Sequence, residues 1–233
     1  MRACVGTQSR IRQSRIRRRP DRAGFARRCA GRIRVGAALK IKPDEKPRLS
    51  SSALRAMLEP LGIDRHAHPL VVVGYRGYYR DSMGAPGVDD RGIYDDAIFL
   101  DSVQATAAFN GNTDPTGYRK GRGTGEDTRG MASLNAGVWY AHRFGMHRKK
   151  YLALCQTGGP VTVTRDGDPP YAHSGMFGIN IHRGGYAATS SLGCQTIHPS
   201  QWEGFIGLMK DQAVRYFGNA WQRRVVPYVL LER

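Results

Sequence analysis

The sequence predicts a mainly β protein, a β-sandwich or barrel with a few short helices and one amphipathic helix near the C-terminus. Among its 233 residues 29 are Gly and 12 are Pro, which favours many short elements joined by turns. Short apolar runs rich in β-branched side chains recur between these turns. The 40% share of hydrophobic residues suits a globular domain, and no run approaches the roughly 18 apolar residues of a membrane span.

The first expected element is a short surface helix over residues 50–62. Its apolar residues recur at helical spacing after a serine cluster that can cap the helix, and Pro60 followed by Gly62 ends it. Strands are expected at residues 70–73, 93–103, 137–140, 151–155, 161–164 and 177–182.

The C-terminal region predicts one amphipathic helix and one strand. The helix follows Pro199, and its apolar face comprises Trp202, Phe205, Ile206, Met209, Ala213 and Phe217. The last strand spans 225–231. Because proline has no N–H to donate, Pro227 requires either that this strand lie at a sheet edge or that the proline stand in its first residues.

Residues 110–125 are expected to form a long polar loop able to contact a substrate. The spacing of Asn110, Asn112 and Asp114 is similar to the start of a calcium loop. However, Pro115 stands where that loop needs Gly, and Gly121 stands where it needs a bidentate Glu. The comparison therefore fails.

Charge is concentrated at the N-terminus. The formal net charge is +17, but residues 1–48 hold 16 of the 36 Lys and Arg residues and 3 of the 19 Asp and Glu residues. The chain therefore divides into a basic disordered arm, 1–48, and a single domain, 49–233.

The arm has three interpretations: a segment that binds nucleic acid phosphates, a solvated tail, or translated sequence upstream of the real start. Its basic start is not followed by an apolar stretch, so no signal peptide is expected.

The cysteines predict thiols rather than disulfides, because Cys4, Cys29, Cys155 and Cys194 form no CxxC pair and no even framework. Cys155 lies within an apolar strand and is expected to be inert. Cys194 instead has small polar neighbours and follows a histidine at a strand end, His182, across a Gly-rich loop. A thiol and a nearby imidazole are the groups that nucleophilic thiol catalysis needs.

The residues Ile181-His182-x-Gly184 followed by Ser191-Leu192-Gly193-Cys194 resemble the active-site signature of the L,D-transpeptidase (YkuD-like) catalytic domain. The family pattern is His-Gly, a loop, and then Ser/Thr-x-Gly-Cys. The resemblance covers residues 137–207 and extends back towards residue 71. The residues around the site are also similar to those of phage- or prophage-encoded members. The resemblance, with no signal peptide expected, implies synthesis in the bacterial cytoplasm and either cell lysis or a phage particle as the route to a site of action outside it.

The resemblance implies an L,D-transpeptidase fold and acyl transfer on a peptidoglycan stem peptide through a thioester. Cys194 would be the nucleophile and His182 the general base and then acid. Ser191 would shape the cysteine loop, and Gly193 with Cys194 would offer backbone donors to the oxyanion. The substrate is expected to contact Arg183, Gly184, Leu192 and Thr196. No cofactor or metal is expected.

This chain departs from the family pattern after the cysteine, where Gln195-Thr196 stands in place of an apolar residue and an Arg. The interval from His182 to Cys194 is also shorter than usual. Arg183 is the candidate for the missing carboxylate-binding charge. A second function class stays open, a non-catalytic wall-binding module or phage structural protein of the same fold, which would contact phage particle proteins.

The sequence offers two other candidate sites. Zinc accepts the ligand types of His173, His182, Cys194 and His198, but their spacing fits no compact knuckle. The acidic pairs at residues 89–90 and 95–96 are expected to be solvated turn residues, because neighbours on a strand point to opposite faces and cannot form a facing dyad.

Overall fold

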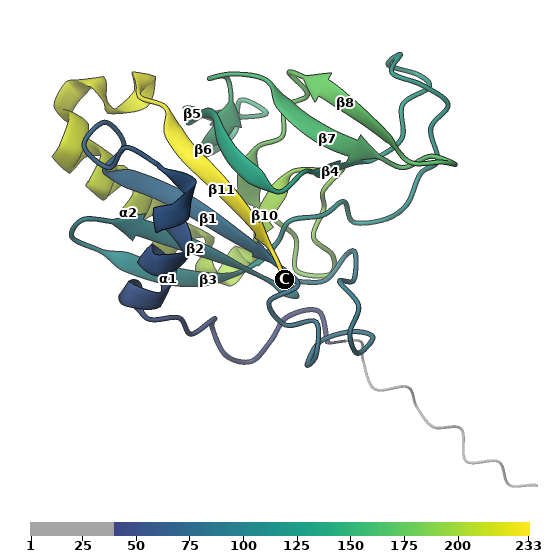
Figure 1. Cartoon of the computed structure of the whole chain (residues 1–233), viewed down its shortest axis with the longest axis horizontal. Coiled ribbons are helices and arrows are strands. Elements are labelled where there is room, and N and C mark those ends of the chain that lie inside the picture. Colours follow the sequence, from purple (N-terminus) through teal and green to yellow (C-terminus); the bar gives the residue numbers. More distant parts are fainter. Residues whose placement is uncertain (1–39) are drawn as a thin grey trace, which may run out of the picture. The chain divides into compact units, whose positions relative to one another are not determined.

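Strands make up most of the regular structure, as the sequence predicts. The structure is a computed structural model that describes residues 40–233 (Figure 1). An eight-stranded sheet closes on itself as a barrel-like sheet. In spatial order its strands are β1 (Leu70–Arg76), β11 (Val226–Glu232), β5 (Gly137–His147), β6 (Tyr151–Gln156), β9 (Ile181–Arg183), β10 (Gln195–Ile197), β3 (Thr106–Asn112) and β2 (Asp96–Ser102).

A second sheet lies beside the barrel (Figure 1). Its strands are β4 (Ala132–Leu134), β7 (Val161–Arg165) and β8 (Tyr171–Gly175), and its neighbours run antiparallel. In the barrel the pairs β1 with β11 and β9 with β10 are parallel. Because a parallel pair needs a crossover, the chain between β9 and β10 forms the loop that carries the predicted cysteine motif.

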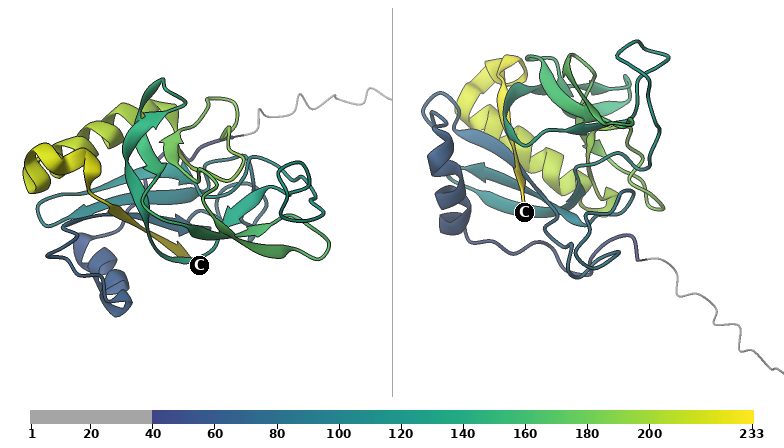
Figure 2. Two further views of the ribbon diagram at one scale, coloured as in Figure 1. Left: turned by 90° about the horizontal axis from the view of Figure 1, so that it is seen from above. Right: turned by 45° about the vertical axis from the view of Figure 1, so that its right-hand side comes forward.

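Two α-helices cover opposite faces of β1 and β2 (Figure 2). Helix α1 (Ser51–Leu58) begins at Ser50, whose hydroxyl accepts a hydrogen bond from the N–H of Ala53, and continues as the 3₁₀ turn η1 (Glu59–Leu61). Helix α2 (Pro199–Phe217) is followed by the 3₁₀ turn η2 (Gly218–Arg223).

The alternation of side chains along β1 and β2 explains the two cores. Val71 and Val73 with Phe99 pack against α1, whereas the residues between them on each strand face α2. The α2 side contains Val72, Ile98, Leu100, Phe109, Trp202, Phe205, Ile206 and Met209. The predicted amphipathic helix near the C-terminus is therefore confirmed, and its apolar face closes one of the cores.

Several elements differ from the expectation. Strands β3, β4, β8 and β10 were not predicted, and β3 includes Asn110 and Asn112, which are buried rather than part of a polar loop. Pro227 does lie in the first residues of β11, at a register shift between Val226 and Tyr228, but β11 is an inner strand between β1 and β5. The bulge removes the need for the missing N–H, so the proline does not require an edge.

The structure places residues 41–48, which the sequence assigns to the basic arm, against the domain. The N–H of Tyr94 donates to the carbonyl of Ile41 over 2.7 Å, and Asn110 Nδ2 donates to the carbonyl of Glu45 over 3.0 Å. Residues 1–39 of the arm, with Cys4 and Cys29, lie outside the described residues. Within residues 40–233, no helix has both the length and the apolarity that crossing a membrane requires.

Candidate active site

The register of β9 and β10 places the predicted nucleophile and base on one face of the sheet. Thr196 pairs with His182 and Gln195 with Ile181, so Cys194 stands level with Asn180 just before β10. Paired residues on neighbouring strands point to the same face, and alternate residues along a strand do so too. Cys194, Asn180 and His182 therefore share one face, while Ile181 and Gln195 point into the barrel.

The loop before Cys194 is held by Ser191, which is buried. Its Oγ accepts from the N–H of Gly193 over 2.9 Å and donates to the carbonyl of Cys194 over 2.7 Å. Gly193 has φ +146°, and a Cβ there would collide with the carbonyl oxygen of Ala132. Because the Gly193 N–H is engaged by Ser191, the N–H of Cys194 is the candidate donor to an oxyanion.

The thiol of Cys194 is half-buried and held by backbone groups. Sγ donates to the carbonyl of Gly178 over 3.2 Å and accepts from the N–H of Asn180 over 3.4 Å. Burial raises the pKa of the thiol above its ordinary value, against the opposing effects of the Asn180 N–H and the charge of Arg148. Among the hydrogen bonds of the described residues, none joins this thiol to His182, so the resting group is a protonated thiol and not an ion pair.

The imidazole of His182 is buried and oriented by its own strand. Nδ1 lies 2.8 Å from the carbonyl oxygen of Arg183, and because a carbonyl can only accept, Nδ1 carries the proton. In the neutral ring Nε2 is then a free acceptor, as a general base requires. Burial, with smaller effects from the charges of His147 and Arg148, lowers the pKa of His182 to about 4, so the ring is neutral at pH 7.

Three further residues of this site were not predicted from the sequence. His147 ends β5, and its ring stacks on that of His182 with centroids 4.3 Å apart. Asn180 Nδ2 lies 3.2 Å from His147 Nδ1. Arg148 follows at the tip of the β5–β6 hairpin with φ +49°. The signal that could have found His147 and Arg148 is a second histidine at a strand end, directly followed by the basic run 148–150.

The four predicted substrate contacts lie in different settings. Arg183 is exposed, with its guanidinium 5.1 Å from the centre of the Tyr151 ring, and Leu192 is 62% exposed. Gly184 is half-buried, and a Cβ there would collide with the hydroxyl of Tyr94. Thr196 is wholly buried beside His182. Arg183 and Leu192 are thus the two that reach the surface.

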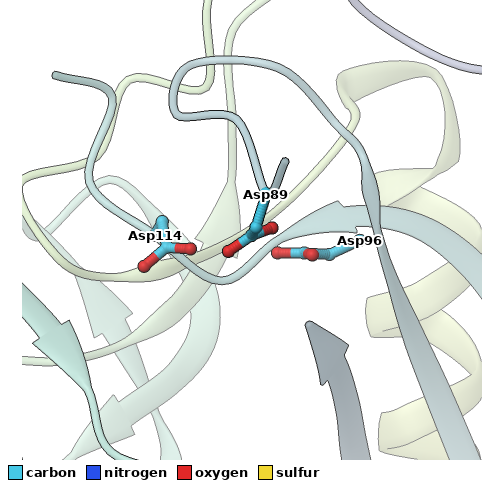
Figure 3. A group of neighbouring side chains, drawn as sticks. All are labelled: Asp89, Asp96 and Asp114. Atoms are coloured by element: carbon cyan, nitrogen blue, oxygen red, sulfur yellow. The ribbon is translucent and has the colours of Figure 1, made fainter. Parts of the chain in front are cut away.

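The acidic residues form a buried group, so the expectation of solvated turn acids was wrong for Asp95 and Asp96, both 0% exposed. Oxygens of Asp89, Asp96 and Asp114 lie within 4.8 Å of one another (Figure 3). They gather because the turn before β2 and the chain after β3 meet at one end of that strand pair. Of the described residues this trio could hold a cation.

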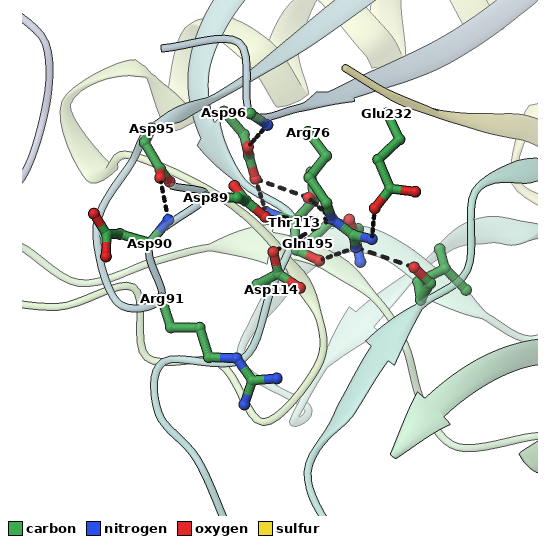
Figure 4. Close-up of polar contacts among 12 residues, drawn as sticks. Arg76, Asp89, Asp90, Arg91, Asp95, Asp96, Thr113, Asp114, Gln195 and Glu232 are labelled. Atoms are coloured by element: carbon green, nitrogen blue, oxygen red, sulfur yellow. Dashed lines mark hydrogen bonds and ion pairs between the residues drawn. The ribbon is translucent and has the colours of Figure 1, made fainter. Parts of the chain in front are cut away.

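Arg76 already supplies positive charge to this group (Figure 4). Its Nε lies 3.3 Å from Asp114 and its Nη1 lies 3.1 Å from Glu232. Asp96 accepts from the N–H groups of Gly77 and Thr113, each over 2.6 Å. The group therefore ties β1, β2, β11 and the chain after β3 together through one buried guanidinium.

The four residues considered as zinc ligands have separate hydrogen-bond partners. His173 Nδ1 accepts from Arg165 Nε over 2.9 Å, and its ring packs on Phe177. His198 Nδ1 pairs with Ser200 at the start of α2. Cys194 and His182 have the backbone partners described above. The arrangement thus divides the four residues between a thiol site and two unrelated contacts.

Comparison of this chain with family models, curated proteins and solved structures returns no match. The case for a function therefore depends on the residues and their geometry.

Proposed function

We propose that this protein is a cysteine acyltransferase or peptidase of the L,D-transpeptidase type, acting on peptidoglycan stem peptides, with that family's fold over residues 49–233. The observation that carries the proposal is the tautomer of His182. Its Nδ1 is committed to the Arg183 carbonyl, which leaves Nε2 as an acceptor on the face that also bears Cys194. The Ser-x-Gly-Cys motif, in a loop that the hydrogen bonds of Ser191 hold, also supports the proposal.

The reaction begins from a neutral thiol and a neutral imidazole. Sγ of Cys194 leaves the Gly178 carbonyl and attacks the substrate carbonyl carbon that precedes a terminal D-amino acid, while the thiol proton passes to Nε2 of His182. The N–H of Cys194 donates to the oxyanion. The C–N bond then breaks, and the departing amine takes the proton from His182.

The thioester is then resolved by an amine or by water. His182 Nε2 accepts a proton from the attacking group, the C–S bond breaks, and the proton returns to sulfur. An amine acceptor yields a cross-link and water yields a trimmed peptide. The exposed basic groups at the hairpin tip and Arg183 give the surroundings of the thiol a positive character that suits a substrate with carboxylates.

The first prediction concerns acyl-enzyme formation. Incubation of the full chain with a carbapenem or a stem peptide is expected to give a mass adduct on Cys194, measured by intact-mass spectrometry. Cys194→Ala removes the nucleophile and the adduct. Cys155→Ala is the matched control, because Cys155 is the other half-buried free thiol among the described residues and should be dispensable. An adduct that persists in Cys194→Ala, or a wild-type protein without one, contradicts the proposal.

A non-catalytic module of the same fold is the second candidate, and one observation favours it: the thiol donates to Gly178 and its pKa is raised. Alkylation of Cys194 separates the two candidates. If His182 activates the thiol, His182→Ala slows alkylation by roughly 10²-fold or more near neutral pH. If Cys194 is inert, wild type and His182→Ala are alkylated at the same rate. Both rates then rise only above roughly pH 8.5, which is the pKa of a free thiol.

A further inference from the structure

Two histidines from separate parts of the barrel lie face to face at the proposed site. The rings of His147 and His182 are 4.3 Å apart between centroids and inclined by 16°. Both residues are buried, with 7% and 5% of their surface exposed. The contact joins the end of β5 to β9, although β6 separates these strands in the sheet.

Asn180 fixes the protonation state of His147. The Oδ1 of Asn180 accepts from the backbone N–H of Gln156 over 2.8 Å, which orients the amide. Nδ2 therefore faces His147 Nδ1 at 3.2 Å, and because an amide nitrogen only donates, Nδ1 is the acceptor. The proton of neutral His147 is then on Nε2. Protonation of Nδ1 would set two donors against each other.

Among residues 40–233, no acidic side chain acts on either ring of the stacked pair, so nothing there balances a second positive charge. The charges of His147 and Arg148, from the β5–β6 hairpin, act on His182. The ring of Tyr151 contacts that of His147, the guanidinium of Arg183 lies over the Tyr151 ring, and Cys194 shares the face of His182. Two imidazolium rings in contact would repel each other in this buried setting, so at most one ring carries charge.

We propose that His147, oriented by Asn180, is a positioning residue that holds the imidazole of His182 in place and keeps it in the neutral, basic form. This inference rests on the function proposed above. The stacked ring prevents rotation of His182 about its side-chain bonds, so Nε2 keeps the direction that the Arg183 hydrogen bond sets. His147 touches no reacting atom in this scheme.

The test uses two substitutions of His147 in the full chain. His147→Gln removes the ring and retains a group that can accept from Asn180. His147→Phe retains the stacked face and removes the second titratable group. His173→Gln is the control, because His173 also packs against an aromatic ring but lies on β8, in the second sheet. Thermal unfolding checks that each variant is folded.

The first readout is the state of His182, followed by ¹⁵N NMR of the imidazoles and independent of turnover. In wild type His182 is expected to stay in the Nδ1–H form well below pH 6. Both His147 variants are expected to shift its protonation midpoint upward by roughly 0.5–1 pH unit, since neither side chain can compete with His182 for the one charge that the buried pair can carry. The midpoint does not move in His173→Gln.

The second readout is the acylation rate at pH 7. His147→Gln is expected to slow it by roughly tenfold because the base is less well oriented, and His147→Phe is expected to restore most of the loss. An unchanged midpoint and tautomer of His182 in both variants overturns this inference. A wild-type protein that forms no acyl-enzyme while the midpoint still moves overturns only the proposed function. If His147→Gln does not fold, the midpoint in His147→Phe decides.

Discussion

At the residue scale, the site depends on hydrogen bonds that each fix one atom as either a donor or an acceptor. The Arg183 carbonyl makes Nδ1 of His182 a donor, and the Gln156 N–H fixes the orientation of the Asn180 amide. Each bond removes an alternative tautomer or amide orientation and so leaves one chemical role for the group. The Cys194 thiol is the exception, since the proposed reaction requires it to exchange its present partner, the Gly178 carbonyl, for His182.

Ser191 offers a direct test of the cysteine loop. Ser191→Ala removes both the acceptor for the Gly193 N–H and the donor to the Cys194 carbonyl, and Gly193 N–H is buried. We expect the free energy of unfolding to fall by about 1–3 kcal/mol, because a buried donor is left without a partner. Urea unfolding measures the change.

Ser190→Ala is the matched control, because Ser190 precedes Ser191 in the same loop and is exposed. Its hydroxyl bonds only the nearby carbonyl of Ala188, over 3.4 Å. We expect a change within about 0.5 kcal/mol. Equal losses in the two variants would show that Ser191 has no special part in holding the loop.

At the element scale, Gln195 shows how β10 joins the site to the barrel interior. Its side chain points inward, where Tyr228 of β11 donates to Oε1 over 2.8 Å. Its Nε2 donates back to the carbonyl of Gly193 over 3.3 Å. Gln195, which departs from the family pattern, thus bonds a core strand to the cysteine loop and needs no substrate to account for it.

The segment over residues 41–48 also behaves as an element of the domain. A variant that lacks residues 1–48 loses the Ile41 carbonyl that pairs with Tyr94 N–H and the Glu45 carbonyl that pairs with Asn110. Compared with a variant that lacks residues 1–39, it is expected to lose about 1–3 kcal/mol of stability, measured by urea unfolding. Equal stability of the two variants would show that the segment contributes nothing.

At the scale of the whole molecule, the cluster of Asp89, Asp96 and Asp114 makes the free energy of unfolding depend on pH. Burial and the neighbouring charges of Asp96 and Asp114 raise the pKa of Asp89 to about 10, and burial with the charge of Asp114 raises that of Asp96 to about 6. A raised folded-state pKa contributes stability that is complete below the unfolded value near 4 and is lost as the pH rises through the folded value.

The expected result is a fall in stability between pH 6.5 and pH 10. Below pH 6.5 the neutral buried histidines His142 and His182, whose pKa values are lowered to about 4, act in the opposite direction and obscure the effect. Urea unfolding at pH 6.5 and pH 9 measures the slope. Asp89→Asn is expected to flatten the slope because it removes the group with the most raised pKa. An equal slope in wild type and Asp89→Asn would contradict this account.

The sequence by itself determined the local features. Spacing of apolar residues predicted the helices and most strands, since an element buries one face with its own period. The bond between His182 and the next carbonyl, and the hydroxyl of Ser191 three residues before Cys194, lie within short segments. The prediction that Cys194 and His182 act together is also local, because the two residues stand at the two ends of one loop.

Only the tertiary structure decided which distant strands meet. The stacking of His147 on His182 depends on the barrel order and on where the β5–β6 hairpin turns, neither of which has a local pattern. The burial of Asp96 likewise depends on the N–H groups of Gly77, which follows β1, and of Thr113, which follows β3. Long-range register is set by the packing of the whole sheet, so the residues next to a position in the chain do not predict it.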